Sequence, residues 1–477
     1  MILHRGVETM PRELLAALQL GRLKQTVARV SEKVPFYRER LAAARISADD
    51  IETLPHVAKL PFTTKSDLRE HYPFGMLAVE RTHLARVHAS SGTKGKPTIV
   101  GYTSNDIRIW QELCARAIMC AGGKPGDLLH NAYGYGLFTG GLGLHYGGEG
   151  LGVTVVPVSG GFTERQVTLI RDLQPDGISA TPSYMLAIAE KMEQLGLDPR
   201  ETSLSYGIFG AEPWSDAMRR TIEQKLALKA VDIYGLSEVV GPGVAIECYE
   251  AQDGLHIGAD HFYAEVVDPE TGEVLPEGAT GELVFTSLTK EAFPVIRYRT
   301  GDIASLTYTP CECGRTTPRM SRVKGRVDDM LIIRGVNVFP AEIEPVLLEH
   351  VELAPHYQLH LSKRGALDYC ELHVELTAHY YAAHIAGRAK EQGADLRGAS
   401  EPPYGLRYEY SNSEEIERCD AVHDLRLRLE SKLRERLNVA AIIKFIRPGG
   451  IARSEGKAVR IVDRRTENVF ETVQRDK

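Results

Sequence analysis

Short runs of β-branched residues alternate with segments of helical pattern between about residue 86 and residue 300. Residues 153–158 and 205–210 are predicted to be buried strands, and residues 164–173 between them are predicted to form a helix. This alternation is typical of α/β domains, in which helices cover a mostly parallel sheet. We therefore expect an α/β fold with a parallel-sheet core.

Residues 262–268 and 282–286 follow a different pattern, because two strand-like runs are joined by a glycine-rich turn segment. This pattern predicts an antiparallel β subdomain. Farther along, a short strand is predicted at 330–333, and Pro340 is predicted to open a helix with acidic residues in its first turn. We place a domain boundary near residues 326–329.

The boundary divides the chain into two expected domains. Residues 1–327 would form a large N-terminal domain, and residues 328–477 would form a small α+β C-terminal domain of about 150 residues, a common domain size. Residues 376–415 are polar and irregular, which favours a surface loop or an appended hairpin.

Composition excludes several classes of function. The chain has 477 residues, of which 43% are hydrophobic and 25% charged, as in ordinary globular proteins. A net charge of −7 argues against nucleic acid as the main partner, and no run approaches the ~20 apolar residues of a membrane span. Seven scattered cysteines and the absence of a signal-peptide core at the N-terminus favour a reduced cytoplasm.

A loop rich in glycine and hydroxyl residues follows the strand-like residues 85–89. Its glycines allow the backbone N–H groups to face an anion, while its hydroxyl residues and a lysine add further donors. In isolation such a loop is more often an ordinary turn, and its spacing is not that of a Walker motif. The candidate phosphate-binding residues are Ser90, Ser91, Gly92, Thr93 and Lys96.

Three later segments are ambiguous by themselves. The first, 135–141, places two aromatic residues among glycines, and the second, 209–214, is a strand followed by a turn. The third, 234–238, ends a predicted strand with a glutamate that would ordinarily be a solvated surface residue. Each segment is compatible with a packed turn as well as with a binding site.

Taken in order along the chain, the phosphate-type loop and four motifs, one of which is the segment 234–238, resemble the adenylate-forming enzyme superfamily. The motifs are Tyr234–Glu238, Tyr298–Asp302, Lys324–Asp329 and Arg453–Ala458. The longer strings Ser237–Gly243 and Ile333–Pro340 resemble those of the phenylacetate–coenzyme A ligase family. The resemblance covers nearly the whole chain, and it implies a mobile C-terminal domain and ATP, Mg²⁺ and coenzyme A as substrates and cofactors.

The resemblance assigns a role to individual residues. Glu238 would bind Mg²⁺, Asp302 the ribose, and Arg326 the phosphates, while Lys457 would stabilise the transition state as a point charge. Asp328 would be the hinge between the domains, and Arg334 and Gly335 would contact coenzyme A. The remaining nucleotide-binding residues would be Gly210, Ala211, Glu212, Pro213, Asp232, Ile233, Tyr234 and Gly235.

The acyl group would lie in a flat slot walled by rings and floored by backbone, which favours an aryl acid over a long fatty chain. Its lining is predicted from three segments that each follow or adjoin a strand. The residues are Tyr135, Phe138, Gly140, Gly141, Ala211, Pro213, Ile233, Gly235, Pro242 and Gly243.

A compact thiol pair, Cys311 and Cys313, lies downstream of Cys248 and His256. Four such ligands could close a tetrahedral structural zinc site, as in some members of the family that the chain resembles. The other interpretation is two unpaired thiols in a loop and one buried cysteine. A zinc ion here would brace the antiparallel subdomain and take no part in catalysis.

The expected reaction is the activation of an aromatic acid, such as phenylacetate or benzoate, to acyl-AMP and then to its coenzyme A thioester. Two alternatives remain open at this point. The acyl group could pass to a carrier protein's phosphopantetheine, or the chain could be a nucleotide-binding protein without turnover. A homodimer is compatible with the sequence, which does not fix the oligomeric state.

Overall fold

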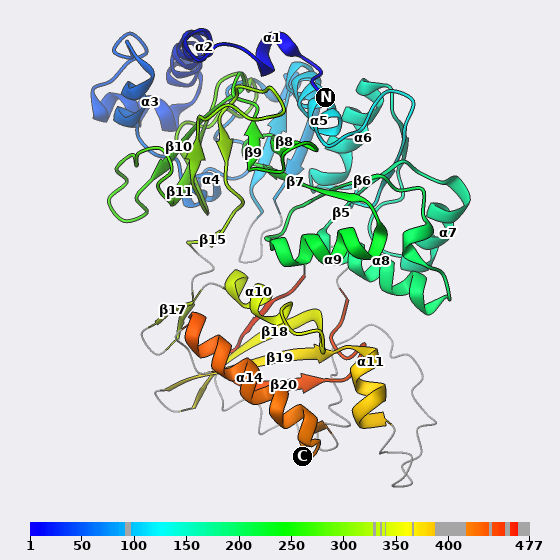
Figure 1. Cartoon of the computed structure of the whole chain (residues 1–477). Coiled ribbons are helices and arrows are strands. Elements are labelled where there is room, and N and C mark those ends of the chain that lie inside the picture. The colour runs from blue at the N-terminus through cyan, green and yellow to red at the C-terminus, as the bar shows by residue number, and fades with distance from the viewer. Residues whose placement is uncertain are drawn as a thin grey trace. The chain divides into compact units, whose positions relative to one another are not determined.

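The computed structural model describes residues 1–90, 97–327, 331–333, 336–338, 340–364, 367–386, 416–437, 441–453 and 458–465. These residues fall into two compact units, coloured along the chain in Figure 1. The N-terminal unit is drawn from Met1–Pro213 and Arg220–Asp328, and the C-terminal unit from Trp214–Arg219, Asp329–Ser454 and Ala458–Lys477. Each unit is described by itself.

A nine-stranded sheet runs through the N-terminal unit in the order β13-β14-β9-β8-β7-β6-β5-β3-β4. Strands β4, β3, β5, β6 and β7 are parallel, as the alternating pattern predicted, whereas β8, β9, β14 and β13 continue the sheet antiparallel. The strands are β3 (Leu128–Asn131), β4 (Thr154–Val156), β5 (Gly177–Ala180), β6 (Tyr206–Gly210), β7 (Lys229–Leu236), β8 (Gly241–Glu247), β9 (Leu255–Ile257), β13 (Leu306–Thr307) and β14 (Arg319–Met320).

Helices connect the parallel strands, which confirms the predicted α/β class. They are α6 (Gly140–Leu151), α7 (Thr163–Leu173), α8 (Pro182–Gln194) and α9 (Asp216–Leu226), while α5 (Ser104–Cys120) leads into the first of these strands, β3. The strand predicted at 205–210 is the fully buried β6. The prediction of a buried strand at 153–158 was wrong in length and burial, because β4 covers three residues at the sheet edge and Thr154 is exposed.

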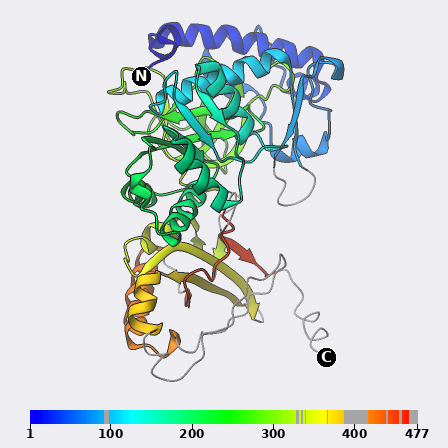
Figure 2. The same cartoon turned by 90° about the vertical axis from the view of Figure 1, so that its right-hand side faces the viewer.

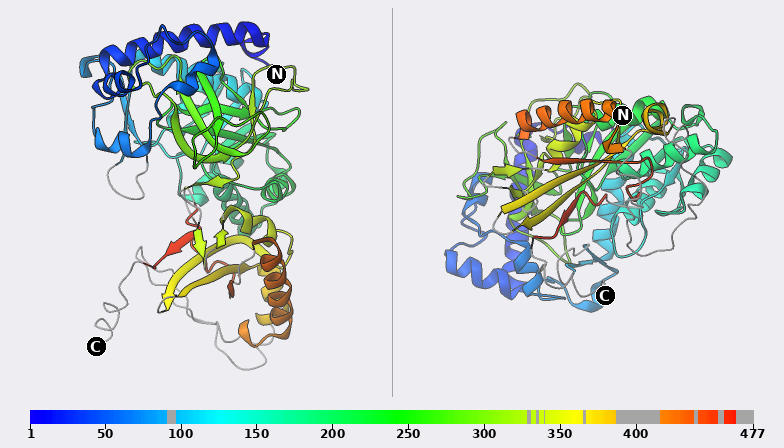
Figure 3. Two further views of the ribbon diagram at one scale, coloured as in Figure 1. Left: turned by 90° about the vertical axis from the view of Figure 1, so that its left-hand side faces the viewer. Right: turned by 90° about the horizontal axis from the view of Figure 1, so that it is seen from below.

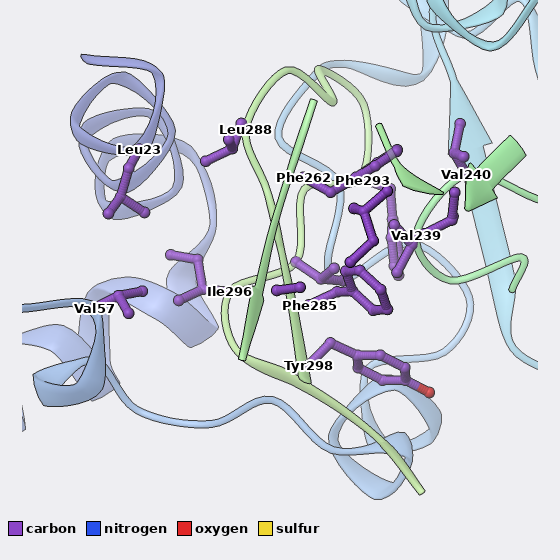
Figure 4. Packing of buried hydrophobic residues seen from close by; sticks show 14 of the residues in the cluster. Leu23, Val57, Val239, Val240, Phe262, Phe285, Leu288, Phe293, Ile296 and Tyr298 are labelled. Carbon is purple, nitrogen blue, oxygen red and sulfur yellow. The ribbon is translucent and has the colours of Figure 1, made fainter. Parts of the chain in front are cut away.

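The predicted antiparallel strands pair in a separate four-stranded sheet, in the order β10-β11-β12-β15. Its strands are β10 (Phe262–Val267), β11 (Gly281–Ser287), β12 (Tyr298–Ala304) and β15 (Gly325–Arg326). Figure 4 shows how Phe262, Phe285 and Tyr298 from this sheet and Leu23 from helix α2 (Arg12–Lys33) contribute to one buried cluster. Burial of these apolar side chains is the main force that holds the sheet in the unit.

The N-terminal helices lie outside these strands, and Figure 2 shows α2 as the long dark-blue helix at the edge of the unit. Thr64 and Asp67 form a capping box at the start of α4 (Lys65–Glu70). The elements are α1 (Arg5–Glu8), α2 (Arg12–Lys33), α3 (Pro35–Ala44), η1 (Leu54–Lys59), α4 (Lys65–Glu70) and η2 (Arg81–His83).

A small antiparallel hairpin stands apart from both sheets. Its strands, β1 (Arg86–Ala89) and β2 (Ile99–Tyr102), pair only with each other among the described residues. Ser90 extends the pairing, since its N–H donates to the carbonyl of Thr98 at 3.0 Å. The hairpin therefore carries the predicted phosphate-binding segment between its two strands.

The C-terminal unit contains a four-stranded sheet in the order β20-β19-β18-β21 and a two-stranded pair, β16-β17. Figure 3 shows α14 along one face of the larger sheet, where Leu425, Leu429 and Leu433 are buried. The elements are β16 (Leu331–Ile333), β17 (Val336–Val338), η4 (Pro340–Glu342), α10 (Ile343–Leu347), β18 (Leu353–Arg364), β19 (Leu367–Leu376), α11 (Ala378–Tyr381), η5 (Ala382–Ala386), α14 (Asp420–Leu437), β20 (Ile442–Ile446) and β21 (Ile461–Asp463).

Candidate active site

Three of the predicted nucleotide-binding residues meet around one carboxylate. Asp302 on β12 faces Arg326 on β15 in the strand register, and the Arg326 Nη1 donates to Asp302 Oδ1 at 2.5 Å. The hydroxyl of Tyr234, at the end of β7, donates to Asp302 Oδ2 at 2.6 Å. Burial, and then the neighbouring carboxylate, raise the pKa of Tyr234 well above its ordinary value, which keeps the phenol a donor.

This arrangement fixes the orientation of the Asp302 carboxylate. Each carboxylate oxygen offers about two lone-pair sites, and Arg326 and Tyr234 each occupy one oxygen. The Arg326 Nη2 also donates to the carbonyl of Thr300 at 3.1 Å, so the guanidinium is held on two sides. An acceptor with fixed orientation is suited to a pair of hydroxyl groups.

The turn after β6 contains a backbone outlier. Gly210 has no room for a side chain, because a Cβ there would lie 2.1 Å from the carbonyl oxygen of Ile233. Ala211 follows with φ of +69°, in the left-handed region that residues with a Cβ adopt at a cost. The Glu212 carboxylate then accepts from the N–H of Ser183 at 2.8 Å and holds the turn against α8. Such strained, held turns cluster at ligand sites.

Glu238 lies in the turn between β7 and β8. Its side chain belongs to a residue that is only 6% exposed, and no described residue forms a hydrogen bond or ion pair with its carboxylate. A carboxylate with little access to water gains from a nearby cation, which replaces part of the lost hydration. The chemistry of this position therefore fits a hard, oxygen-binding cation such as Mg²⁺.

The predicted acyl segments come together at the start of α6. A Cβ on Gly143 would contact Pro242, and one on Gly241 would contact Thr139, so residues 139–143 lie against residues 241–243. Thr139 and Ser237 also share a hydrogen bond of 3.2 Å between their hydroxyl oxygens. These contacts show that the two glycine-rich segments adjoin each other.

Tyr135 precedes α6 and is held by its hydroxyl. The Asn131 side-chain amide donates to this oxygen at 2.8 Å, and the His145 Nδ1 lies 3.2 Å away. Burial raises the pKa of Tyr135 to about 12, so the phenol stays neutral near pH 7. The ring is thereby fixed in place.

Asp232 and Ile233 lie on β7, where the register pairs them with Phe209 and Gly210 of β6. The Asp232 carboxylate lies 3.5 Å from the Arg322 Nε, and Glu247 completes this buried ion network. Ile233 supplies the carbonyl oxygen that excludes a side chain at Gly210. Both residues thus support the β6 turn from the neighbouring strand.

Several predicted residues lie outside the described part of the chain. They are Ser91, Gly92, Thr93, Lys96, Asp328, Arg334, Gly335 and Lys457. Most of the predicted extension at 376–415 also lies outside it, apart from α11 and η5. Their roles remain predictions from the sequence.

The sequence analysis missed an aromatic stack behind the Glu238 turn. Tyr102 and Trp110 stack at 5.3 Å between ring centroids, and the Tyr102 hydroxyl donates to the carbonyl of Val240 at 2.9 Å. Trp110 donates through Nε1 to the carbonyl of Pro242 at 2.9 Å. The buried Lys290 Nζ lies 3.4 Å from the Tyr102 ring centroid. Trp110 is one of only two tryptophans, which was the available signal.

The four predicted zinc ligands converge in the structure. Their side-chain donor atoms all lie within 4.8 Å of one another, with Cys248 and Cys311 sulfurs 3.7 Å apart and Cys313 Sγ 3.4 Å from His256 Nε2. Tetrahedral zinc with ordinary bond lengths gives about 3.8 Å between two sulfurs and about 3.5 Å between sulfur and nitrogen. The donor set and its spacing therefore fit a closed zinc site.

The strands explain this convergence and correct its predicted place. Cys248 follows β8, and His256 on β9 pairs in register with Arg319 of β14, just after the turn that carries Cys311 and Cys313. The cluster thus lies at the antiparallel end of the nine-stranded sheet, not in the four-stranded subdomain. Thr317 contacts the other ring nitrogen of His256 at 3.3 Å, a contact of the kind that orients metal-binding histidines.

Both domains of the chain match families of known proteins. A family model described as AMP-binding enzyme matches residues 14–289, and one described as AMP-binding enzyme C-terminal domain matches residues 335–396 and 405–465. A phenylacetate-coenzyme A ligase of Thermus thermophilus is 50% identical over 466 residues, covering 98% of this chain and 100% of the relative. A phenylacetate-coenzyme A ligase of Escherichia coli strain K12 is 49% identical over 460 residues, covering 96% and 97%.

The fold is also similar to that of solved CoA ligases. A 2-hydroxyisobutyryl-CoA ligase in the postadenylation state, in complex with an acyl-AMP (R3-HIB-AMP), has a TM-score of 0.84 at 28% identity and covers 98% of this chain and 93% of its own. The same ligase in complex with 2-HIB-AMP and CoA in the thioesterification state gives 0.66 at the same identity and coverage. Among the helices that the structure describes, none is both long and apolar enough to cross a membrane.

Proposed function

We propose that this chain, which belongs to the phenylacetate–coenzyme A ligase family of AMP-binding enzymes, uses ATP to join phenylacetate to coenzyme A, with release of AMP and pyrophosphate. One observation carries the proposal: half of all aligned residues are identical to a phenylacetate-coenzyme A ligase whose entire length the chain covers. The similarity to a CoA ligase solved with acyl-AMP and with CoA supports the two-step course.

In the first step, the acid's carboxylate attacks the α-phosphate of ATP and pyrophosphate leaves. Asp302 would accept from the ribose hydroxyls in an orientation fixed by Tyr234 and Arg326. The guanidinium of Arg326 would also offset phosphate charge. The Gly210–Pro213 turn, with its strained Ala211, would bring backbone close to the flat adenine.

Glu238 would hold Mg²⁺ beside the phosphates. When bound, the ion would neutralise charge that develops on the phosphate oxygens. The buried carboxylate without a described partner supports this assignment. The Tyr102–Trp110 stack would keep the turn in place through the carbonyls of Val240 and Pro242.

Lys457 would supply the remaining positive charge at the α-phosphate and carboxylate oxygens, by analogy of the Arg453–Ala458 motif with the family. In the second step, the thiol of coenzyme A displaces AMP. We propose that the C-terminal domain, residues 328–477, turns about Asp328 between the steps, and that Arg334 and Gly335 then contact coenzyme A.

The aryl ring of the acid would lie between Tyr135 and Phe138 and the glycine backbone of residues 140–141 and 241–243. The contact between these segments supports a narrow slot, since small residues let the two backbones approach closely. A planar ring would fit such a slot with little loss of conformational entropy, unlike a long acyl chain.

We also propose one structural zinc per chain, held by Cys248, His256, Cys311 and Cys313. The ion would join β8, β9 and the turn before β14, and it would not take part in the reaction. None of the seven cysteines, all of which lie in the described part of the chain, forms a disulfide, and this supports the reducing cytoplasm as the place of the reaction.

An acid panel tests the proposal. Purified protein with ATP, Mg²⁺ and coenzyme A should release pyrophosphate with phenylacetate at a kcat/KM at least about tenfold above that with benzoate or a C12 fatty acid. Formation of phenylacetyl-CoA should match pyrophosphate release one to one. Better turnover of the fatty acid, or pyrophosphate release without any thioester, would contradict the proposal.

A further inference from the structure

A buried carboxylate in the C-terminal unit organises the loop that follows β20. Glu375, near the end of β19, is only 2% exposed. Its Oε1 accepts from the N–H of Gly449 at 2.8 Å and from Arg453 Nη2 at 2.6 Å. Its Oε2 accepts from the N–H of Ile451 at 3.2 Å and from Arg453 Nη1 at 2.6 Å.

These four contacts do more than hold the loop on the sheet. Two backbone N–H groups fix the path of the chain, while the bidentate pair fixes the direction of the Arg453 side chain. Burying a carboxylate is costly, and apolar packing would have sufficed to cover the sheet. The polar arrangement instead specifies one geometry for residues 449–453.

The chain is fixed again a few residues later. The N–H of Leu359 on β18 donates to the carbonyl of Arg460 at 2.8 Å, and the Arg460 guanidinium lies over the Tyr357 ring at 4.3 Å. Strand β21 then pairs in parallel with β18. Since β18 and β19 are neighbouring antiparallel strands, both fixed points belong to one hairpin.

We propose that Glu375, through Arg453, is a positioning residue for the first half-reaction. Arg453 lies four residues before Lys457, whose charge the proposed function places at the α-phosphate; the inference rests on that assignment. A charge that acts in a transition state must be placed accurately, because a displacement of about 1 Å lowers the rate about 100-fold. Glu375 would set the point from which the lysine segment departs.

The test separates the two half-reactions. Glu375→Gln keeps the shape of the side chain but removes the charge and replaces one acceptor by a donor. We expect acid-dependent ATP–pyrophosphate exchange to fall about 30-fold, mainly in kcat, with the KM for ATP within about twofold. Thioester formation from supplied acyl-AMP should stay within about twofold of wild type.

Glu371→Gln is the matched control. It makes the same change on the same strand, but Glu371 contacts His373 and not the 449–453 loop. Both half-reactions should remain at the wild-type rate. Arg453→Gln removes the other partner from a more exposed position, so it serves if Glu375→Gln does not fold, and it should show the same selective loss.

The outcomes are distinct. Selective loss of the exchange reaction in Glu375→Gln or Arg453→Gln supports the inference. Equal loss in both half-reactions would make Glu375 a purely structural residue, and no loss in either would remove its role altogether. If the wild type itself showed no acid-dependent exchange with any acid of the panel, the proposed function would fail, and not the inference about Glu375.

Discussion

The cysteine–histidine cluster and the Asp302 cluster are both assembled from strands of the N-terminal unit, but they are satisfied in different ways. Around Asp302, each polar group has a protein partner: Tyr234 and Arg326 each donate to one carboxylate oxygen. In the other cluster, the four donor atoms all lie within 4.8 Å of one another, and two of the pairs are 3.4 and 3.7 Å apart, as around a tetrahedral ion.

The difference indicates what each region needs. A site whose groups are already paired stays in shape without a ligand and can bind and release one at every turnover. A site whose thiols and imidazole converge on a common centre depends on an ion for its shape, because deprotonated thiols would repel one another without it. The Asp302 cluster is therefore suited to a ligand that binds and leaves, and the cysteine–histidine cluster to an ion that stays bound.

Cys311→Ser should give the largest effect, because it removes one ligand of the proposed zinc. We expect the free energy of unfolding to fall by about 3 kcal/mol, and Tm by about 4 °C, while kcat at 25 °C stays within about twofold. Calorimetry and metal analysis measure both effects. Cys120→Ser, a buried thiol outside the cluster, should keep one zinc per chain. If removal of zinc from the wild type left its Tm unchanged, the cysteine–histidine cluster would not depend on an ion, and the proposed difference between the two regions would be wrong.

Asp302→Ala should lower catalysis and leave stability nearly unchanged, the opposite of Cys311→Ser. Loss of the ribose acceptor is expected to lower kcat/KM for ATP about 100-fold, or about 2.7 kcal/mol, with zinc content unchanged. Steady-state kinetics at saturating phenylacetate measures this loss. Asp268→Ala removes a carboxylate that accepts from the N–H groups of Glu270 and Thr271 in the turn after β10, and as the control it should leave kcat/KM for ATP unchanged. A stability loss without a kinetic one would make Asp302 structural.

Lys290 tests a third situation, a buried cation with an aromatic face beside it. Burial lowers the pKa of Lys290 to about 7, although Asp106 opposes this shift. Between pH 7 and about 10 the unfolded state therefore binds more protons than the folded state, so the free energy of unfolding should rise with pH. Urea unfolding at pH 7 and pH 9 should show a rise of about 2 kcal/mol in wild type that Lys290→Met lacks. Equal pH dependence in both proteins would show that Lys290 stays charged over the Tyr102 ring.

Tyr234→Phe should have the smallest effect of the series. It removes one hydrogen bond to Asp302 and leaves the ring on Phe285, with which it stacks. We expect KM for ATP to rise about fivefold, close to 1 kcal/mol, with Tm nearly unchanged. Tyr263→Phe on β10 is the control: it also removes one tyrosine hydroxyl, and it should leave KM for ATP unchanged. A loss as large as that of Asp302→Ala would mean that Tyr234 contacts the nucleotide itself.

Local patterns predicted the fold class well because they reflect local physics. The capping box at Thr64, the fully buried β6 and the antiparallel β10–β11 pair follow from residues that are neighbours in sequence. The burial of β4 could not be read in this way, since whether a strand lies in the centre or at the edge of a sheet depends on strand order.

The candidate site was predictable where a motif carries its own chemistry. The four candidate zinc ligands could be named because cysteines are few and, with histidine, chemically distinctive. The sheet that they brace was assigned wrongly, because the pairing of β9 with β14 joins segments about 60 residues apart. Tyr102 and Trp110 were missed for the same reason: they act on backbone carbonyls more than 130 residues away.

The β1–β2 hairpin, which pairs with neither large sheet, has a consequence for local stability. Val100 and Tyr102 pack the ribbon on the main core, but each of its strands is hydrogen-bonded to only one neighbouring strand, whereas β5 and β6 each lie between two, so the ribbon amides should exchange with solvent faster than those of β5 and β6. Nucleotide bound by the predicted phosphate-binding residues between β1 and β2 would stabilise this ribbon more than it stabilises β5 or β6. Hydrogen exchange of residues 86–89 and 99–102 should therefore slow on addition of ATP before that of β5 or β6 changes, and would report occupancy of the site without any turnover.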